Sequence, residues 1–207
     1  RLEREGLVHE GVELALNTVR QRVDFPSLTN GKVVTVYGQT EVTKDLISAR
    51  LAHDLPLVFE ADSVVPVDID GDSPRLDFDV GDQAHSIDCD FIAGCDGFHG
   101  VCRASLPPDR LRVFERVYPF AWLGILAHAA PPSEELIYSR HDRGFSLCSM
   151  RGPAVSRHYI QCAVDEDLAD WPDDRFWDEL DRRLARDGSS PVNRGPVVDT
   201  SVTPMRS

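Results

Sequence analysis

The stretch Phe91-Ile92-Ala93-Gly94-Cys95-Asp96-Gly97-Phe98-His99-Gly100 decides how this chain is interpreted. A short apolar run ends in Gly-x-Asp-Gly, so the pattern predicts a buried strand, a tight turn and the start of a helix. A carboxylate held by glycines at the end of such a strand suits the binding of a sugar or phosphate-linked ligand at the crevice of an α/β sheet. Asp-Gly is also an ordinary turn signal, and the stretch alone leaves both interpretations open.

Composition excludes several classes of protein. The 207 residues suffice for one large domain or two small ones, and the formal net charge of -13 argues against non-specific nucleic-acid binding. The five cysteines have no CxxC spacing, which favours free thiols in a reducing compartment. The chain shows no signal peptide and no apolar run that could span a membrane, so we expect a cytoplasmic protein. Its histidines do not have the spacing of metal ligands, so we expect no metal.

Hydrophobic alternation and turn residues divide the chain near residue 112. The first part predicts, in order, a β-hairpin at 6–24, a loop at 25–32, a strand at 33–37, a helix at 41–53, strands at 55–67 and 75–80, the motif strand at 86–95 and a short helix at 101–106. The second part predicts an antiparallel sheet of strands at 113–129, 136–138, 145–150 and 157–164, then a helix at 171–183 and a loop at 187–193. We therefore expect an α/β (α+β) fold class with domains at 1–112 and 113–207.

Four polar residues lie in or beside otherwise apolar strands of the second part: Ser149, Arg151, Arg157 and Tyr159. Residues two apart in a strand point to the same face, so these residues form two same-face pairs. If the two faces coincide, the group could hold a small carboxylate, with an arginine giving a two-pronged contact. A solvated outer face of the sheet explains the pattern equally well. Tyr138, two strands back, adds a phenolic proton carrier.

Two polar residues of the first part are weaker candidates. Gln39 lies at a strand-to-helix join, where its amide can donate a hydrogen bond to a ligand oxygen. His9 lies just before the alternating residues of the hairpin, which begin at Val12, and a lone histidine is more often a surface or capped residue than a functional one.

The sequence resembles the family of flavin-dependent aromatic hydroxylases over essentially its whole length. The resemblance is densest at 6–13 (GLVHEGVE), 34–43 (VTVYGQTEVT), 92–100 (IAGCDGFHG), 113–120 (VFERVYPF) and 135–138 (ELIY). The Asp-Gly segment marks only the wide class, whereas the other segments point to its 4-hydroxybenzoate 3-monooxygenase branch. The resemblance implies part of a Rossmann-like FAD-binding domain at 1–112 and a substrate-binding antiparallel sheet with a helix at 113–207.

The resemblance also implies a reaction and its cofactors. The expected activity is an FAD-dependent monooxygenase that converts 4-hydroxybenzoate to 3,4-dihydroxybenzoate with O2 and NADPH or NADH. Asp96 matches a residue that serves both FAD and pyridine-nucleotide binding, and Gln39 matches a flavin contact. Arg157 matches an arginine beside the flavin that affects its movement, while His99 and Arg206 match positions that help to hold NADPH.

The remaining matched residues concern the substrate. Ser149, Arg151 and Tyr159 match residues that bind the substrate carboxylate. Tyr138 matches the tyrosine that contacts the substrate phenol, and His9 matches the far end of the proton path from that phenol. A tyrosine titrates near pH 10 and a histidine near pH 6.5, so such a path could carry the phenol proton away.

Other interpretations stay open at this point. The chain could belong to a related hydroxylase of another carboxylated phenol, or be an inactive truncated ligand-binding module. The ends look cut, so we expect an internal piece of a longer protein whose other flavin motifs lie outside it, and a piece that is inactive and binds FAD poorly by itself. The resemblance further implies a homodimer.

Overall fold

The structure is a computed structural model that describes residues 1–185 and 192–207. The fold is mixed α/β, as the sequence predicted. It contains two compact units, one of residues 1–45 and 115–207 and the other of residues 46–114. The sequence had suggested a division near residue 112, but β2 (Gly11–Leu16) pairs in parallel with β9 (Leu136–His141) and so joins the start of the chain to its second half. The assignment of cofactor and substrate domains to 1–112 and 113–207 stays a prediction.

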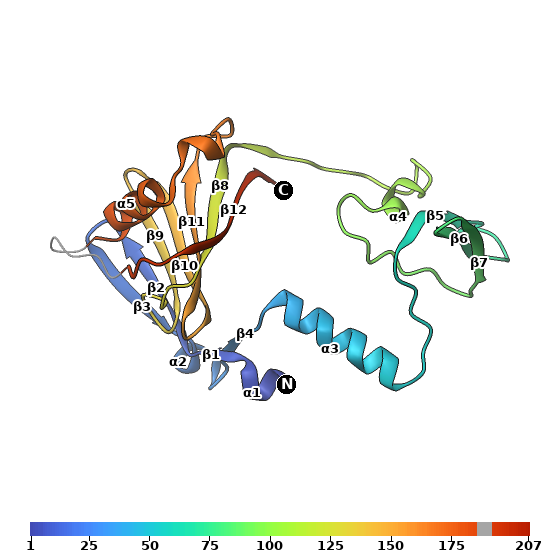
Figure 1. The fold of residues 1–207 in the computed structure, drawn as a ribbon, viewed down its shortest axis with the longest axis horizontal. Helices are drawn as coiled ribbons and strands as arrows, with labels where there is room; N and C mark the ends of the chain where they lie inside the picture. The colour runs from blue at the N-terminus through green and yellow to red at the C-terminus, as the bar shows by residue number, and fades with distance from the viewer. Residues whose placement is uncertain (186–191) are drawn as a thin grey trace. The chain divides into compact units, whose positions relative to one another are not determined.

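The larger unit is built on a seven-stranded sheet (Figure 1). Its strand order is β12-β8-β11-β10-β9-β2-β3, and every neighbouring pair except β2 with β9 is antiparallel. The strands not yet given are β3 (Val19–Asp24), β8 (Val117–Ala127), β10 (Gly144–Gly152), β11 (Val155–Cys162) and β12 (Val197–Arg206). The predicted four-strand sheet is therefore part of a larger one, completed by the N-terminal hairpin and by β12.

Helix α5 (Asp173–Leu184) covers one face of this sheet (Figure 1). Its buried apolar side chains recur at helical spacing and pack against inward-facing residues of the strands. The core contains Phe176, Trp177, Leu180 and Leu184 of α5 with Leu123, Ile125, Ile137 and Ile160 of the sheet. Each such buried side chain stabilises the fold by about 1.5–3 kcal/mol relative to exposure. The loop predicted at 187–193 lies mostly outside the described residues.

Strand alternation separates the two faces of the sheet. In β11, Ser156, His158 and Ile160 are buried beneath α5, whereas Arg157 and Tyr159 point to the opposite face. That opposite face, here called the open face, carries the polar and aromatic side chains of the candidate site.

The rest of the larger unit consists of short elements. These are α1 (Leu2–Glu5), β1 (Leu7–His9), α2 (Phe25–Thr29), β4 (Val34–Val36), the beginning of α3 (Gln39–Ala52) and a 3-10 turn at Leu168–Asp170. β1 and β4 form a separate antiparallel pair. The loop expected at 25–32 contains α2 instead, because the Asp24 carboxylate accepts a hydrogen bond from the Ser27 backbone at 3.1 Å and Pro26 is preorganised for a first turn.

The smaller unit contains a three-stranded antiparallel sheet, β5-β6-β7, and the short helix α4 (Val101–Ala104). The strands are β5 (Ala61–Val67), β6 (Arg75–Val80) and β7 (Gln83–Asp88). The expected buried strand at 91–95 is wrong for this structure, where that run has no strand partner and Phe91 is 92% exposed. A strand needs a paired neighbour, and none of the described strands pairs with this run.

Candidate functional site

Two neighbouring strands bring the four predicted polar residues together on the open face. Ser149 of β10 pairs directly with Arg157 of β11, and Leu147 pairs with Tyr159, so the two strands present the same face. The Arg151 Nη1 donates to the Ser149 Oγ at 3.2 Å, and the Arg157 Nε donates to the Tyr159 hydroxyl at 3.2 Å. The sequence left open whether the two same-face pairs share one face, and the register of β10 with β11 places Ser149 and Arg157 on the same face.

Arg151 occupies an irregular position in β10. Met150 pairs with Ser156 and Gly152 with Val155, so Arg151 is an extra residue in the ladder. Such a bulge bends the strand and changes the direction of its side chain. Arg151 is exposed, while Ser149 beside it is 4% exposed. A buried hydroxyl and an accessible guanidinium thus stand next to each other.

Gly124 of β8 makes room for Tyr159. The two residues pair across β8 and β11, and a Cβ atom on Gly124 would lie 2.6 Å from the Tyr159 Cε1 and 2.8 Å from its Cδ1. No real Cβ atom tolerates such contacts, so the ring takes this position only because position 124 has no side chain. No pattern in the sequence indicated a role for Gly124 in the site.

A cavity of about 770 Å³ joins this polar group to the start of α3. Its walls include Arg151, Arg157 and Tyr159 from the sheet and Gly38 and Gln39 from the strand-to-helix join. All of these residues belong to the larger unit. Four residues predicted from sequence to bind cofactor or substrate therefore line one cavity.

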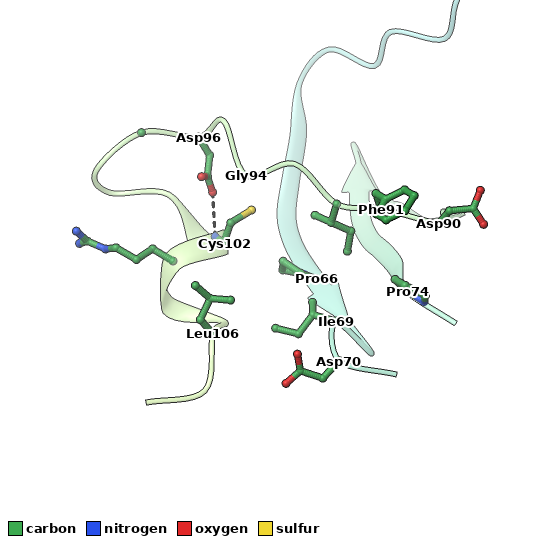
Figure 2. Close-up of a pocket in the computed structure, with 13 residues that line it drawn as sticks. Pro66, Ile69, Asp70, Pro74, Asp90, Phe91, Gly94, Asp96, Cys102 and Leu106 are labelled. Carbon is green, nitrogen blue, oxygen red and sulfur yellow. Dashed lines mark hydrogen bonds between the residues drawn. The ribbon is translucent and has the colours of Figure 1, made fainter. Parts of the chain in front are cut away.

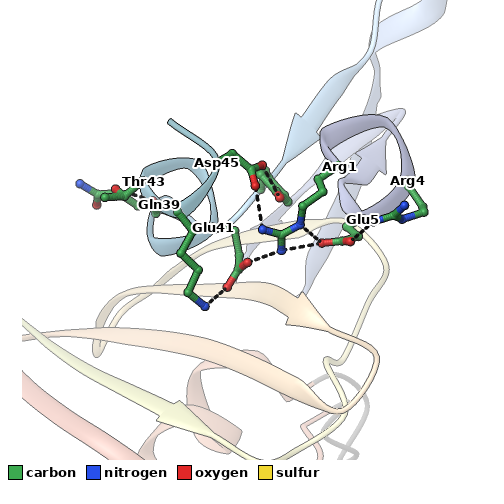
Figure 3. Close-up of polar contacts among 9 residues, drawn as sticks. Arg1, Arg4, Glu5, Gln39, Glu41, Thr43 and Asp45 are labelled. Atoms are coloured by element: carbon green, nitrogen blue, oxygen red, sulfur yellow. Dashed lines mark hydrogen bonds and ion pairs between the residues drawn. The ribbon is translucent and has the colours of Figure 1, made fainter. Parts of the chain in front are cut away.

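An ion-pair network holds the first turns of α3 against α1 (Figure 3). The Arg1 guanidinium contacts Glu5, Glu41 and Asp45, the last at 2.7 Å. The Tyr37 hydroxyl also donates to Asp45 at 2.9 Å. Because Glu41 and Asp45 lie in the two turns that follow Gln39, this network fixes where α3 begins at the cavity wall.

A second cavity on the open face is aromatic. Its volume is about 750 Å³, and it is lined by Phe120, Trp122, Tyr138, Phe145, Leu147, Tyr159, Gln161 and Thr203. Tyr138 of β9 lies 6.1 Å from Phe145 between ring centroids. Tyr159 borders both cavities, so the aromatic cavity lies next to the polar group. A benzene ring suits such walls, and the polar group would face one end of it.

His9 is buried in β1, with 1% of its surface exposed. Neither ring nitrogen has a hydrogen-bond partner among the described residues. Burial lowers the pKa of His9, while the nearby Glu135 carboxylate opposes that shift. Among the described residues, no hydrogen bond connects His9 to Tyr138, so the predicted proton path between them stays a prediction.

The motif of the smaller unit caps a helix (Figure 2). The Asp96 Oδ2 accepts the backbone N–H of Cys102 at 2.9 Å, and this hydrogen bond lowers the pKa of Asp96. Gly97 has φ +74°, which a glycine adopts without strain. Asp96 and Gly97 also line a cavity of about 530 Å³ with Phe91 and Leu106. Asp96 and Gly97 thus form a turn that leads into the helix, while the cofactor role of Asp96 stays a prediction.

The two residues expected to hold NADPH have simple surroundings. His99 is exposed in the smaller unit, with its ring edge-on to Phe98. Arg206 ends β12 in the larger unit and pairs with Glu115 at 3.4 Å, both side chains being largely exposed. Their predicted role is not tested by these contacts.

Comparison with known proteins assigns the family. Residues 1–207 match the model of the FAD binding domain family, so the chain belongs to that family. The chain is also 48% identical over 206 residues to p-hydroxybenzoate hydroxylase of Acinetobacter baylyi, covering 100% of this chain and 51% of that protein. The resemblance to flavin-dependent aromatic hydroxylases and the prediction of FAD as cofactor are thereby confirmed.

Solved structures share the fold. A mutant of PqsL from P. aeruginosa has a TM-score of 0.71 at 18% identity, covering 91% of this chain and 52% of that one. The p-nitrophenol 4-monooxygenase PnpA of Pseudomonas putida DLL-E4 has a TM-score of 0.71 at 10% identity, covering 98% and 52%. At these identities the likeness concerns the fold alone. The chain spans about half the length of these relatives.

The residues of the cavity between the polar group and the start of α3 fit a flavin. Gln39, Arg151, Arg157 and Tyr159 all offer N–H or O–H donors, and the edge of an isoalloxazine ring is rich in carbonyl oxygen and nitrogen acceptors. The beginning of α3 lines the same wall, where the N–H groups of Glu41 and Val42 donate to the Gly38 carbonyl. A cavity of this volume also lies within the range of small-molecule sites.

Proposed function

We propose that the protein carrying this chain is an FAD-dependent monooxygenase that hydroxylates 4-hydroxybenzoate to 3,4-dihydroxybenzoate with NAD(P)H and O2. The observation that supports this most strongly is the junction of a donor-rich cavity with an aromatic cavity at Tyr159. The sequence identity to p-hydroxybenzoate hydroxylase favours the same substrate class.

In this proposal the substrate ring lies in the aromatic cavity. Arg151 binds the substrate carboxylate as an ion pair, and the hydroxyls of Ser149 and Tyr159 complete its hydrogen bonds. This anchor fixes which ring carbon faces the cofactor, which is a positioning effect. Apolar walls exclude water from the reacting carbon.

Two of the proposed cofactor residues, Gln39 and Arg157, line the same cavity as the anchor Arg151. Gln39 and Arg157 contact the flavin, Asp96 binds FAD and the pyridine nucleotide, and His99 and Arg206 hold NADPH. When bound, FAD that has been reduced by the pyridine nucleotide would activate O2. This chain's own residues orient the two ligands and exclude solvent.

Tyr138 contacts the substrate phenol and passes its proton toward His9. The ring attacks an electrophilic oxygen more readily as a phenolate, so removal of this proton assists the reaction. Burial lowers the pKa of His9, which favours the neutral imidazole, and a neutral imidazole has one ring nitrogen that accepts a proton.

The location and assembly of the protein are predictions too. No helix in residues 1–185 and 192–207 is long and apolar enough to cross a membrane. A cytoplasmic homodimer is the arrangement that we propose from the family resemblance.

Replacement of Arg151 by alanine tests the anchor. In the full-length protein, we expect Arg151→Ala to raise the KM for 4-hydroxybenzoate about tenfold or more, because a charged hydrogen bond contributes about 1.5–3 kcal/mol. Arg140→Ala is a matched control, since Arg140 is an exposed arginine of the neighbouring strand β9. An unchanged KM in Arg151→Ala would show that Arg151 does not bind the substrate carboxylate.

A further inference from the structure

β12 contains an extra residue that changes which of its side chains face the site. Val197 pairs with Ala127 of β8 and Asp199 pairs with Leu126, so Val198 is inserted into the ladder. Val197 packs against the core beneath α5, yet Asp199 lies on the open face. In a regular strand, position 199 would point to the α5 face. The bulge therefore brings the Asp199 carboxylate to the open face.

The Asp199 carboxylate holds the Arg157 guanidinium. The Arg157 Nη1 donates to the Asp199 Oδ2 at 2.9 Å, and its Nη2 donates to the Ser201 Oγ at 3.2 Å. The third contact is the donation from Nε to the Tyr159 hydroxyl. Arg157 reaches these partners across β8, where Leu126 is paired with both Arg157 and Asp199.

The three contacts leave the guanidinium oriented but not saturated. A guanidinium has five N–H groups, so donors remain for a ligand in the cavity that Arg157 lines. The Arg157 side chain is 17% exposed, whereas Asp199 is 56% exposed. Asp199 is the charged partner among the three, and a charge-assisted hydrogen bond is stronger than a neutral one.

We propose that Asp199 is a positioning residue that fixes the Arg157 guanidinium at the wall of the cavity shared with Gln39, before the cofactor binds there. A free arginine side chain loses considerable rotamer entropy when it is ordered. A carboxylate that orders it in advance lowers this cost at the binding step. The inference rests on the proposed contact between Arg157 and the flavin.

FAD titration of the full-length apoprotein tests this proposal, with flavin fluorescence as the readout. We expect Asp199→Asn to weaken FAD binding about threefold to tenfold, since a partly exposed ion pair contributes modestly and the ordering of Arg157 adds to it. Asp199→Glu keeps the carboxylate and is expected to recover part of that affinity. Asp165→Asn is the matched control, because Asp165 is exposed and makes no described contact with Arg157.

A double-mutant cycle with Arg157→Ala separates this inference from the proposed function. In the Arg157→Ala background, Asp199→Asn should cause no further loss of FAD affinity. If Arg157→Ala itself leaves FAD affinity unchanged, the cofactor role of Arg157 is wrong. If Arg157→Ala weakens binding but Asp199→Asn leaves it unchanged or tighter, only the positioning role of Asp199 is overturned.

Discussion

The absence of a side chain at Gly124 determines where the Tyr159 ring lies. In Gly124→Ala, the new Cβ atom would lie 2.6 Å and 2.8 Å from two carbons of the Tyr159 ring. Carbon atoms prefer about 3.5–4.0 Å, so the ring must move by roughly 1 Å. Because the Tyr159 hydroxyl contacts Arg157 and borders both cavities, this movement disturbs the substrate end of the site.

The contact between the new Cβ atom and the Tyr159 ring should weaken the binding of 4-hydroxybenzoate. Overpacking of a filled site costs about 1–3 kcal/mol. If most of this free energy opposes the ligand-bound position of Tyr159, the dissociation constant for 4-hydroxybenzoate rises roughly fivefold to a hundredfold. We expect this rise in an equilibrium titration of the full-length, FAD-loaded protein.

Gly152→Ala serves as the matched control. Apart from Gly152 itself and its two chain neighbours, no atom of the described residues lies within 4 Å of a Cβ built on Gly152, so the same chemical change should leave the dissociation constant unaltered there. Circular dichroism of both variants checks that each is folded. A folded Gly124→Ala protein that binds 4-hydroxybenzoate normally would refute the argument that Gly124 sets the position of Tyr159.

The other predictions concern stability. Burial lowers the pKa of His158 to about 4, below the usual 6.5, so the unfolded chain takes up a proton between these values that the folded chain does not. The contribution of neutral His158 to the free energy of unfolding is therefore fully present above about pH 6.5 and falls by up to about 3 kcal/mol as the pH drops to 4. Urea unfolding at pH 7 and pH 5 measures this loss. A His158→Gln variant with the same pH dependence would contradict the assignment to His158. Glu179→Gln should lower the free energy of unfolding by about 3–5 kcal/mol, because Glu179 and Arg183 form an ion pair at 2.9 Å with both side chains under a tenth exposed. Arg143→Gln, which removes a half-exposed partner of the same carboxylate, should cost less than about 1 kcal/mol, and equal losses in the two variants would show that burial is not the cause.

Local sequence pattern was sufficient for the elements with a clear hydrophobic period. The α5 stripe and the alternation in β11 predicted both the helix over the sheet and the shared face of Arg157 and Tyr159. Same-face geometry needs only the two-residue repeat of a strand, so spacing alone indicated it.

Features that depend on distant pairing could not be read from the sequence. β12 carries Asp199 and Pro204, which are poor strand formers, and it becomes a strand because it pairs with β8. The bulges at Arg151 and Val198 likewise exist only relative to their partner strands. Gly124 had no visible signal, because its significance lies in a ring contributed by another strand.

The run at 91–95 shows the opposite error. Its apolar composition predicted a buried strand, but apolar residues form a buried strand only where other strands flank them. In the described residues no strand does so.

The most direct test of the proposed function is the oxidation of NAD(P)H by the full-length, FAD-loaded protein with and without 4-hydroxybenzoate. We expect 4-hydroxybenzoate to stimulate the oxidation and 3,4-dihydroxybenzoate to form in step with it, while a phenol that lacks the carboxylate stimulates it far less. Oxidation that does not respond to 4-hydroxybenzoate, or that responds without formation of the dihydroxy product, would contradict the account.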